Sequence, residues 1–287
     1  MSRRAIIERE RRWARWVAPV AGLPLLLFFL SLLLRSQLGT TSGLATEALR
    51  AIDEHKGTVL GSGILAGLAY MALAPPLTFL FRAAAVRSGS MLKGLVGLCV
   101  VGPLLFGVQS IAGVIAQVQA ASDFVVQEQG VGDIYSLAEN LFRESTLVAI
   151  AQATGAAGLL SLIFAVVYTS LWAMRTGLLT RFTGAFGIAL GVALVLGPLA
   201  QTVLPVLFML IAYVGLVIAG RAPGMRPPAW EAGEAVPWPK PGEAPREPSS
   251  NGAVEPEEIP GLDEEERQRA NRERRERARK RKRKRRT

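Results

Sequence analysis

Very few residues of this 287-residue sequence belong to the types that carry out chemistry at protein sites. The chain contains a single histidine, His55, and a single cysteine, Cys99. A zinc site needs several clustered Cys, His or carboxylate ligands, and a disulfide within one chain needs two cysteines, so the sequence predicts neither. No recognisable motif places a nucleophile beside a base. We therefore expect a protein without enzymatic activity, cofactor or bound metal.

Three glutamines are the candidate binding groups within the apolar part of the chain. Gln109 and Gln117 are spaced to share one face of a helix, and Gln152 lies in the next apolar segment. Glutamines in membrane proteins usually hydrogen-bond between helices. The alternative is that the three line a cavity for a neutral or amphipathic small molecule, opened by helix kinks at Pro75-Pro76 and Pro103.

The second candidate binding group is a run of positive charge near the end of the sequence. Anionic lipid would attract it by roughly 1 kcal/mol per basic residue, and ribosomal RNA would bind it through phosphates. A third interpretation is a topology tail with no dedicated partner. No aromatic residue is interleaved, so stacking on bases is not expected. The run consists of Arg277, Arg279, Lys280, Arg281, Lys282, Arg283, Lys284, Arg285 and Arg286.

The elements that position these groups are predicted to be membrane-spanning helices. The chain is 50% hydrophobic and 20% charged, and the apolar residues are concentrated before residue 220. A transmembrane helix needs roughly 20 predominantly apolar residues. The fold class is therefore all-α, a polytopic transmembrane bundle of about six spans. The expected spans are 16–34, 58–81, 94–118, 147–174, 184–200 and 203–219, with the last turn at Gln201 and Thr202.

The charges that flank the spans predict the orientation. Lys and Arg near helix ends are retained in the cytoplasm, and with six spans the basic segments all fall on one side. Both termini are then cytoplasmic, whereas five spans would place the basic tail outside. The excess of Arg over Lys, with abundant Ala and Gly, is typical of GC-rich bacteria, so the bacterial inner membrane is the expected location. The residues assigned to the cytoplasm include Arg3, Arg4, Arg9, Arg11, Arg12, Arg15, Arg82, Arg87, Lys93, Arg175, Arg181, Arg221 and Arg226.

Small residues repeated every four positions predict close helix packing, because lipid supplies no hydrophobic force between helices. We expect them to pack this chain's own bundle, with a homodimer face as the alternative. The rows are Ala149, Ala153, Ala157 and Ser161; Ala185, Ala189, Ala193 and Gly197; Gly187 and Gly191; and Gly63 and Gly67. Two outer loops also carry one apolar helical face each, which predicts capping helices near 44–52 and 134–142.

The sequence divides into four parts by composition. Residues 1–15 form a basic cytoplasmic segment, 16–220 the bundle, 221–261 a Pro/Glu-rich linker and 262–287 an Arg/Lys-rich cytoplasmic tail. The proline content of the linker precludes a packed core, so we expect it to be disordered. Pairs such as Glu265 with Arg269 predict partial helix in the tail.

The stretch YTSLWAMRTGLLTRFTGAFGIALG, residues 168–191, resembles a span junction of a bacterial six-span family known as domain of unknown function 4386. There, a span ends in a basic residue, a short turn follows and the next span opens with small residues; Thr180 stands where proline is common. The resemblance implies a six-span fold, and it brings no established activity or catalytic residues that could be carried over to this chain. From the residues, we expect a membrane-anchored interaction or scaffold protein whose tail meets anionic lipid or RNA, or alternatively a transport-like protein.

Overall fold

The structure is a computed structural model that describes residues 3–38, 45–128, 134–143, 146–196, 200–223 and 227–238. Within these ranges the chain forms helices and no strand, which confirms the all-α class. The helices are α1 Arg3–Val20, α2 Leu23–Arg35, α3 Ala45–Glu54, α4 Lys56–Met71, α5 Ala74–Arg87, α6 Leu98–Gln127, α7 Ile134–Arg143, α8 Thr146–Arg175, α9 Arg181–Ala193, α10 Ala200–Ala219 and α11 Ala229–Ala232, with short 3-10 turns η1 Ser36–Leu38 and η2 Lys93–Gly97.

Among the described residues, five apolar stretches are long enough to cross a membrane, so the protein is a membrane protein. The first two are each made of two helices, and both breaks precede a proline in the first turn of the next helix. Proline is tolerated there because the first-turn amides have no intrahelical partner. The kink expected at Pro75-Pro76 is thus confirmed, whereas α6 continues through Pro103. The five stretches are Arg3–Arg35, Lys56–Arg87, Lys93–Gln127, Thr146–Arg175 and Thr202–Ala219.

The fifth expected span, 184–200, is shorter than predicted. Helix α9 has 13 residues, or about 20 Å at 1.5 Å per residue, against roughly 30 Å of hydrocarbon. The turn expected at Gln201 and Thr202 is wrong, because both residues lie in the first turn of α10. The chain instead leaves the helix at Leu194, shortly before Gly197 and Pro198 in the sequence. Those two residues interrupt a helix more strongly than Gln and Thr do.

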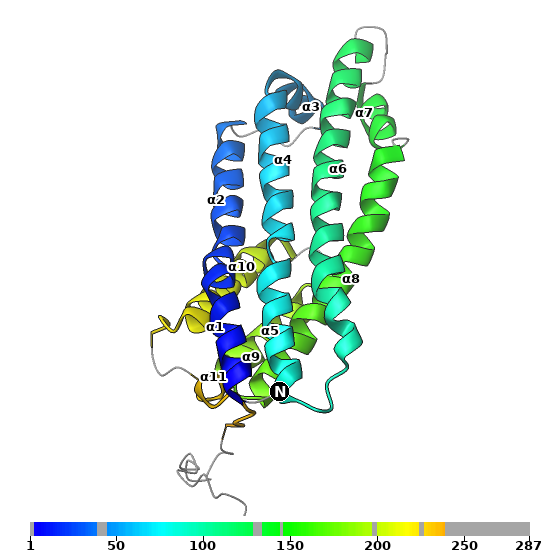
Figure 1. Cartoon of the computed structure of the whole chain (residues 1–287). Coiled ribbons are helices and arrows are strands. Elements are labelled where there is room, and N and C mark those ends of the chain that lie inside the picture. Colours follow the sequence, from blue (N-terminus) through cyan, green and yellow to red (C-terminus); the bar gives the residue numbers. More distant parts are fainter. Residues whose placement is uncertain are drawn as a thin grey trace, which may run out of the picture. The chain divides into compact units, whose positions relative to one another are not determined.

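Helices α9 and α10 form a hairpin that enters and leaves at one end of the bundle (Figure 1). Helix α9 runs antiparallel to the C-terminal half of α8, with Gly184 close to Met174 and Gly191 close to Val167. Helix α10 then returns toward α1, where Gly215 approaches Ala18. The start of α9 and the end of α10 therefore lie at the same end as α1.

Glycines on α6 and α8 bring these two long helices into backbone contact. A Cβ on Gly102 would lie 2.6 Å from the Leu162 nitrogen, and one on Gly158 would lie 2.6 Å from the Phe106 nitrogen. The expected glycine pair Gly63 and Gly67 similarly packs α4 against α6. By contrast, most alanines of the expected small-residue rows face outward from the bundle. The exposed alanines are Ala149, Ala153, Ala157, Ala185 and Ala189. The close contacts of α6 with α8 and α4 are therefore made by helix faces that carry glycine, and not by the alanine rows.

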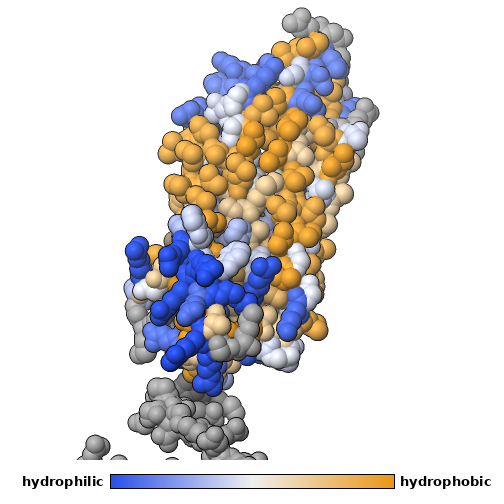
Figure 2. Space-filling model, in the orientation of Figure 1, coloured by the Kyte–Doolittle hydropathy of each residue, from blue (hydrophilic) through white to orange (hydrophobic). Residues whose placement is uncertain are grey.

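The two ends of the bundle are polar and its middle is apolar. Helices α3 and α7 lie at one end and pack on α6 around buried Leu49, Ala121 and Phe124, which confirms the expected capping helices (Figure 1). Figure 2 shows an apolar band between two polar ends on the visible face. Side chains such as Leu26, 63% exposed, and Phe164, 63% exposed, would be unfavourable in water and suit lipid.

The first compact unit of the chain ends at Trp238, which is also the last described residue. The predicted boundary at residue 220 is therefore displaced, because residues 227–238 pack on the bundle. For this stretch the predicted disorder is wrong: Ala229 is fully buried and Trp230 is 5% exposed. The remainder of the predicted linker from 239, and the whole tail 262–287, lie outside the described residues.

Candidate functional site

The three candidate glutamines do not gather around one cavity in the described residues. Gln109 is half-buried on α6 and packs against Gly155 of α8, as expected for a residue between helices. Gln117 is also half-buried on α6, and Gln152 is exposed on α8. None of the three lines the two cavities found near α1. Their role in binding a substrate stays a prediction.

The structure instead concentrates polar contacts at the end of the bundle where α1 begins, which we call the basic end. Its centre is an ion pair between Arg87, at the end of α5, and Glu10 of α1. The Arg87 side chain is fully buried and the Glu10 side chain is 9% exposed. Both guanidinium Nη atoms donate to Glu10, and Nη2 lies 2.8 Å from Oε2. This two-point geometry fixes the rotation of α1 relative to α5.

Arg87 also holds the segment that follows the bundle. Its Nη2 donates to the Ala229 carbonyl at 3.1 Å, and its guanidinium lies 5.6 Å from the centre of the Trp230 ring. The ring of Phe79 also lies parallel to the Trp230 ring, with the two ring centres 6.1 Å apart. Arg87 therefore joins α1, α5 and α11 through one buried charge, in a setting where an unpaired charge would be costly.

Residues 227–238, which we call the strap, are also fastened to the turn between α8 and α9. Trp230 Nε1 donates to the Leu178 carbonyl at 2.9 Å, and Trp238 Nε1 donates to the Leu179 carbonyl at 2.8 Å. The Val236 amide donates to the Thr176 carbonyl at 3.1 Å. These bonds give hydrogen-bond partners to backbone carbonyls in the turn that follows α8.

Two glycines in the left-handed region allow this close approach. Gly177 has φ +76°, and a side chain there would collide with the Val236 carbonyl. Gly233 has φ +66° and ends α11 against Ile7 of α1. Other residues adopt this conformation at a cost, so both positions favour glycine for conformation as well as for space.

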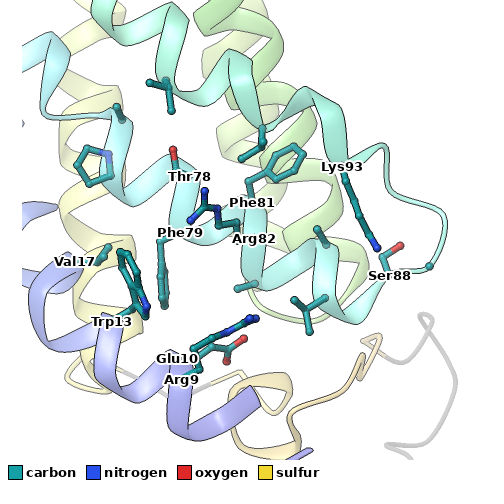
Figure 3. Close-up of a pocket in the computed structure, with 18 residues that line it drawn as sticks. Arg9, Glu10, Trp13, Val17, Thr78, Phe79, Phe81, Arg82, Ser88 and Lys93 are labelled. Atoms are coloured by element: carbon teal, nitrogen blue, oxygen red, sulfur yellow. The ribbon is translucent and has the colours of Figure 1, made fainter. Parts of the chain in front are cut away.

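A cavity of about 970 Å³ lies beside the ion pair, between α1, α5 and the start of α6 (Figure 3). Its wall contains both charged and apolar side chains. Arg9 and Glu10 come from α1, Arg82 from α5 and Lys93 from η2, while Trp13, Phe79, Val86 and Val100 supply apolar surface. In Figure 3, Arg82 extends into the space between the Trp13 side and the Lys93 side. The cavity therefore has a cationic part and an apolar part.

One polar atom of this cavity has no partner within the described residues. Thr78, one helical turn before Arg82 on α5, has a buried hydroxyl oxygen without a hydrogen bond. Buried hydroxyls usually find a partner, often the carbonyl four residues earlier in the helix. Thr78 is among the residues that line the cavity, and the hydroxyl oxygen itself is buried at the cavity wall.

Sequence reasoning assigned Arg87 and Arg82 only to the topology signal and did not identify Glu10 as a partner. Glu8 and Glu10 are the only acids in an arginine-rich stretch before the first span. Their isolation among arginines was the sequence feature that could have indicated an ion pair. The two tryptophans at 230 and 238 in a proline-rich stretch were a second signal, because such large apolar side chains usually pack. The nine-residue basic run lies outside the described residues.

Comparisons with known proteins do not assign a function to the basic end. No protein family, no curated protein and no solved structure matches the chain. The resemblance of residues 168–191 to a six-span family stays a prediction, and the functional argument depends on the structure of the basic end.

Proposed function

We propose that the protein is a membrane anchor that presents its polybasic tail at the cytoplasmic surface, where the tail binds anionic lipid or ribosomal RNA. The observation that carries the proposal is the strap. Because Trp238 is bonded to the turn after α8, the chain that leads to the tail leaves the bundle at a fixed point.

The length of chain between Trp238 and the basic run is suitable for a tether that keeps the run near the bundle. The composition of 239–261 predicts a disordered linker, and a disordered chain of that length has a root-mean-square span of about 25–30 Å. The basic run begins at Arg277, after the further stretch 262–276, so we expect it within several nanometres of Trp238. Restricting a charged segment to such a volume raises its effective concentration toward a nearby partner. With roughly 1 kcal/mol per basic residue, binding of several kcal/mol to an anionic surface is available.

The test uses the full chain reconstituted in zwitterionic vesicles, mixed with a second population of anionic or zwitterionic vesicles, or with ribosomes. Neutralising part of the run should lower capture by about tenfold, with a reduced salt dependence, because fewer counterions are released. The four substitutions are Arg281→Gln, Lys282→Gln, Arg283→Gln and Lys284→Gln.

A matched variant removes four charges from the preceding segment and should retain most of the capture. It carries Arg267→Gln, Arg269→Gln, Arg272→Gln and Arg274→Gln. If the wild-type chain captures neither anionic vesicles nor ribosomes, or if the two variants behave alike, the proposal fails.

A transport-like role for a neutral or amphipathic small molecule is the second candidate. It is favoured by the position of the cavity beside the break between α4 and α5, where Ala74 and Pro75 line its wall. Uptake into proteoliposomes separates the two candidates, because neutralising the tail run should leave transport intact while it lowers capture by about tenfold.

A further inference from the structure

We infer that the cavity at the basic end binds the headgroup of an anionic phospholipid from the surrounding leaflet. This inference goes beyond the proposed function, because it concerns the bundle and does not depend on the tail.

The first argument is the depth of the cavity relative to the membrane. Trp13, which lines the cavity, is 54% exposed, and Trp16, one turn further along α1, is 76% exposed. Exposed tryptophans of membrane proteins sit at the headgroup level. The cavity wall also includes Val86 and Val100, which are exposed at its apolar part. The site thus spans the boundary between headgroups and hydrocarbon, where a lipid has its phosphate and the first carbons of its chains.

The second argument is charge. Three cations, Arg9, Arg82 and Lys93, line the cavity against one carboxylate, that of Glu10. Both oxygens of Glu10 accept hydrogen bonds from Arg87, which is not itself among the lining residues, so this carboxylate is already compensated. Within the described part of the chain, neither Arg82 nor Lys93 forms an ion pair. The cavity therefore favours an anion, and phosphate suits Arg and Lys donors.

The third argument is the unpaired hydroxyl of Thr78. It lies on the same face of α5 as Arg82, one turn deeper in the bundle. A phospholipid carries ester oxygens just below its phosphate, and these accept hydrogen bonds. With a phosphate beside Arg82, an ester oxygen of the same lipid would lie at the depth of Thr78. Rotation of the Thr78 side chain about its Cα–Cβ bond would bring the buried hydroxyl to that oxygen. A zwitterionic lipid offers the same atoms, but its ammonium adds positive charge beside Lys93, so an anionic headgroup is preferred.

The experiment is native mass spectrometry of the full-length protein with phosphatidylglycerol or phosphatidylcholine added at equal concentration. The wild-type chain should retain phosphatidylglycerol about tenfold better. A cavity variant, Arg82→Gln with Lys93→Gln, should lose this preference, because both headgroup cations are removed. The matched control is Arg4→Gln with Arg12→Gln, which removes two charges from exposed positions of α1 that do not line the cavity. Circular dichroism and thermal unfolding confirm that each variant is folded.

Thr78→Val is the second variant, since it keeps the volume of the side chain and removes only the hydroxyl. It should weaken phosphatidylglycerol retention severalfold. The chain with the neutralised tail run should retain the lipid like wild type, which separates this inference from the proposed function. Equal retention of the two lipids by the wild-type chain would overturn the inference. Equal loss in the cavity and control variants would also overturn it, as would displacement of the lipid by an equal concentration of glycerol phosphate, which has no acyl chains.

Discussion

Arg87 is the residue on which the arrangement of the basic end depends most. Its buried guanidinium bonds Glu10, the Ala229 carbonyl and the Ala83 carbonyl at 2.9 Å. Replacing both members of a buried pair by apolar residues is often tolerated, whereas removing one member leaves an uncompensated buried charge. The stabilising effect of Arg87 is therefore conditional on Glu10.

We expect Arg87→Met to lower the free energy of unfolding by about 3–5 kcal/mol, because Glu10 is left buried and unpaired. The double variant Glu10→Leu with Arg87→Met should regain a large part of that loss. Thermal unfolding in detergent, followed by circular dichroism, measures both. Arg82→Met, which removes an exposed cation one and a half turns away on α5, is the matched control and should have little effect. A single variant as stable as the control would contradict the role assigned to the pair.

Residue-scale partners of this kind could not be predicted from the sequence. Arg87 and Glu10 are far apart in the chain, and each belongs to a segment whose charges are explained by topology alone. Their pairing requires one particular rotation of α1 against α5, to which core packing through residues such as Val17 and Phe79 also contributes. The same holds for Gln109, whose type suggested a binding site and whose neighbour Gly155 makes it an interhelical contact.

At the scale of elements, the contact between α6 and α8 depends on glycine. We expect Gly158→Ala to destabilise the bundle by about 1–3 kcal/mol, because the added Cβ meets the backbone of α6 and the helices must separate. Gly113→Ala on α6 is the control, since nothing lies within 4 Å of its Cβ position. Denaturant titration of the detergent-solubilised protein measures the difference. Equal stability of the two variants would show that α6 and α8 do not rely on this close approach.

Elements with a clear hydropathy pattern were predictable, whereas the length of α9 and the packing of the strap were not. The span expected at 147–174 agrees with α8, Thr146–Arg175, because hydropathy over some 30 residues determines it. The helices α3 and α7 were also predicted from the sequence, because each has one apolar face. The length of α9 was not predicted, because the polar pair Gln201 and Thr202 suggested a turn, whereas the helix ends at Ala193, shortly before Gly197 and Pro198 in the sequence. The strap was missed because proline content outweighed its two tryptophans.

At the scale of the whole membrane unit, residues 3–238, charge and apolar surface are segregated along the bundle axis. Arg3 forms an ion pair with Glu234, so the start of α1 and the strap lie at the same end. The cavity residues Arg9, Arg82 and Lys93 lie there too, and α3 and α7 lie at the opposite end (Figure 1). By the positive-inside rule, the basic end would face the cytoplasm.

Cysteine accessibility tests this orientation most directly. In a Cys99→Ser background, single cysteines are introduced at two exposed positions, Glu47→Cys on α3 and Ala235→Cys in the strap. A membrane-impermeant maleimide applied to intact cells should label the first, and should label the second only after permeabilisation. Labelling of both positions from the same side of an intact membrane would contradict a bundle that crosses the bilayer with its basic end inside.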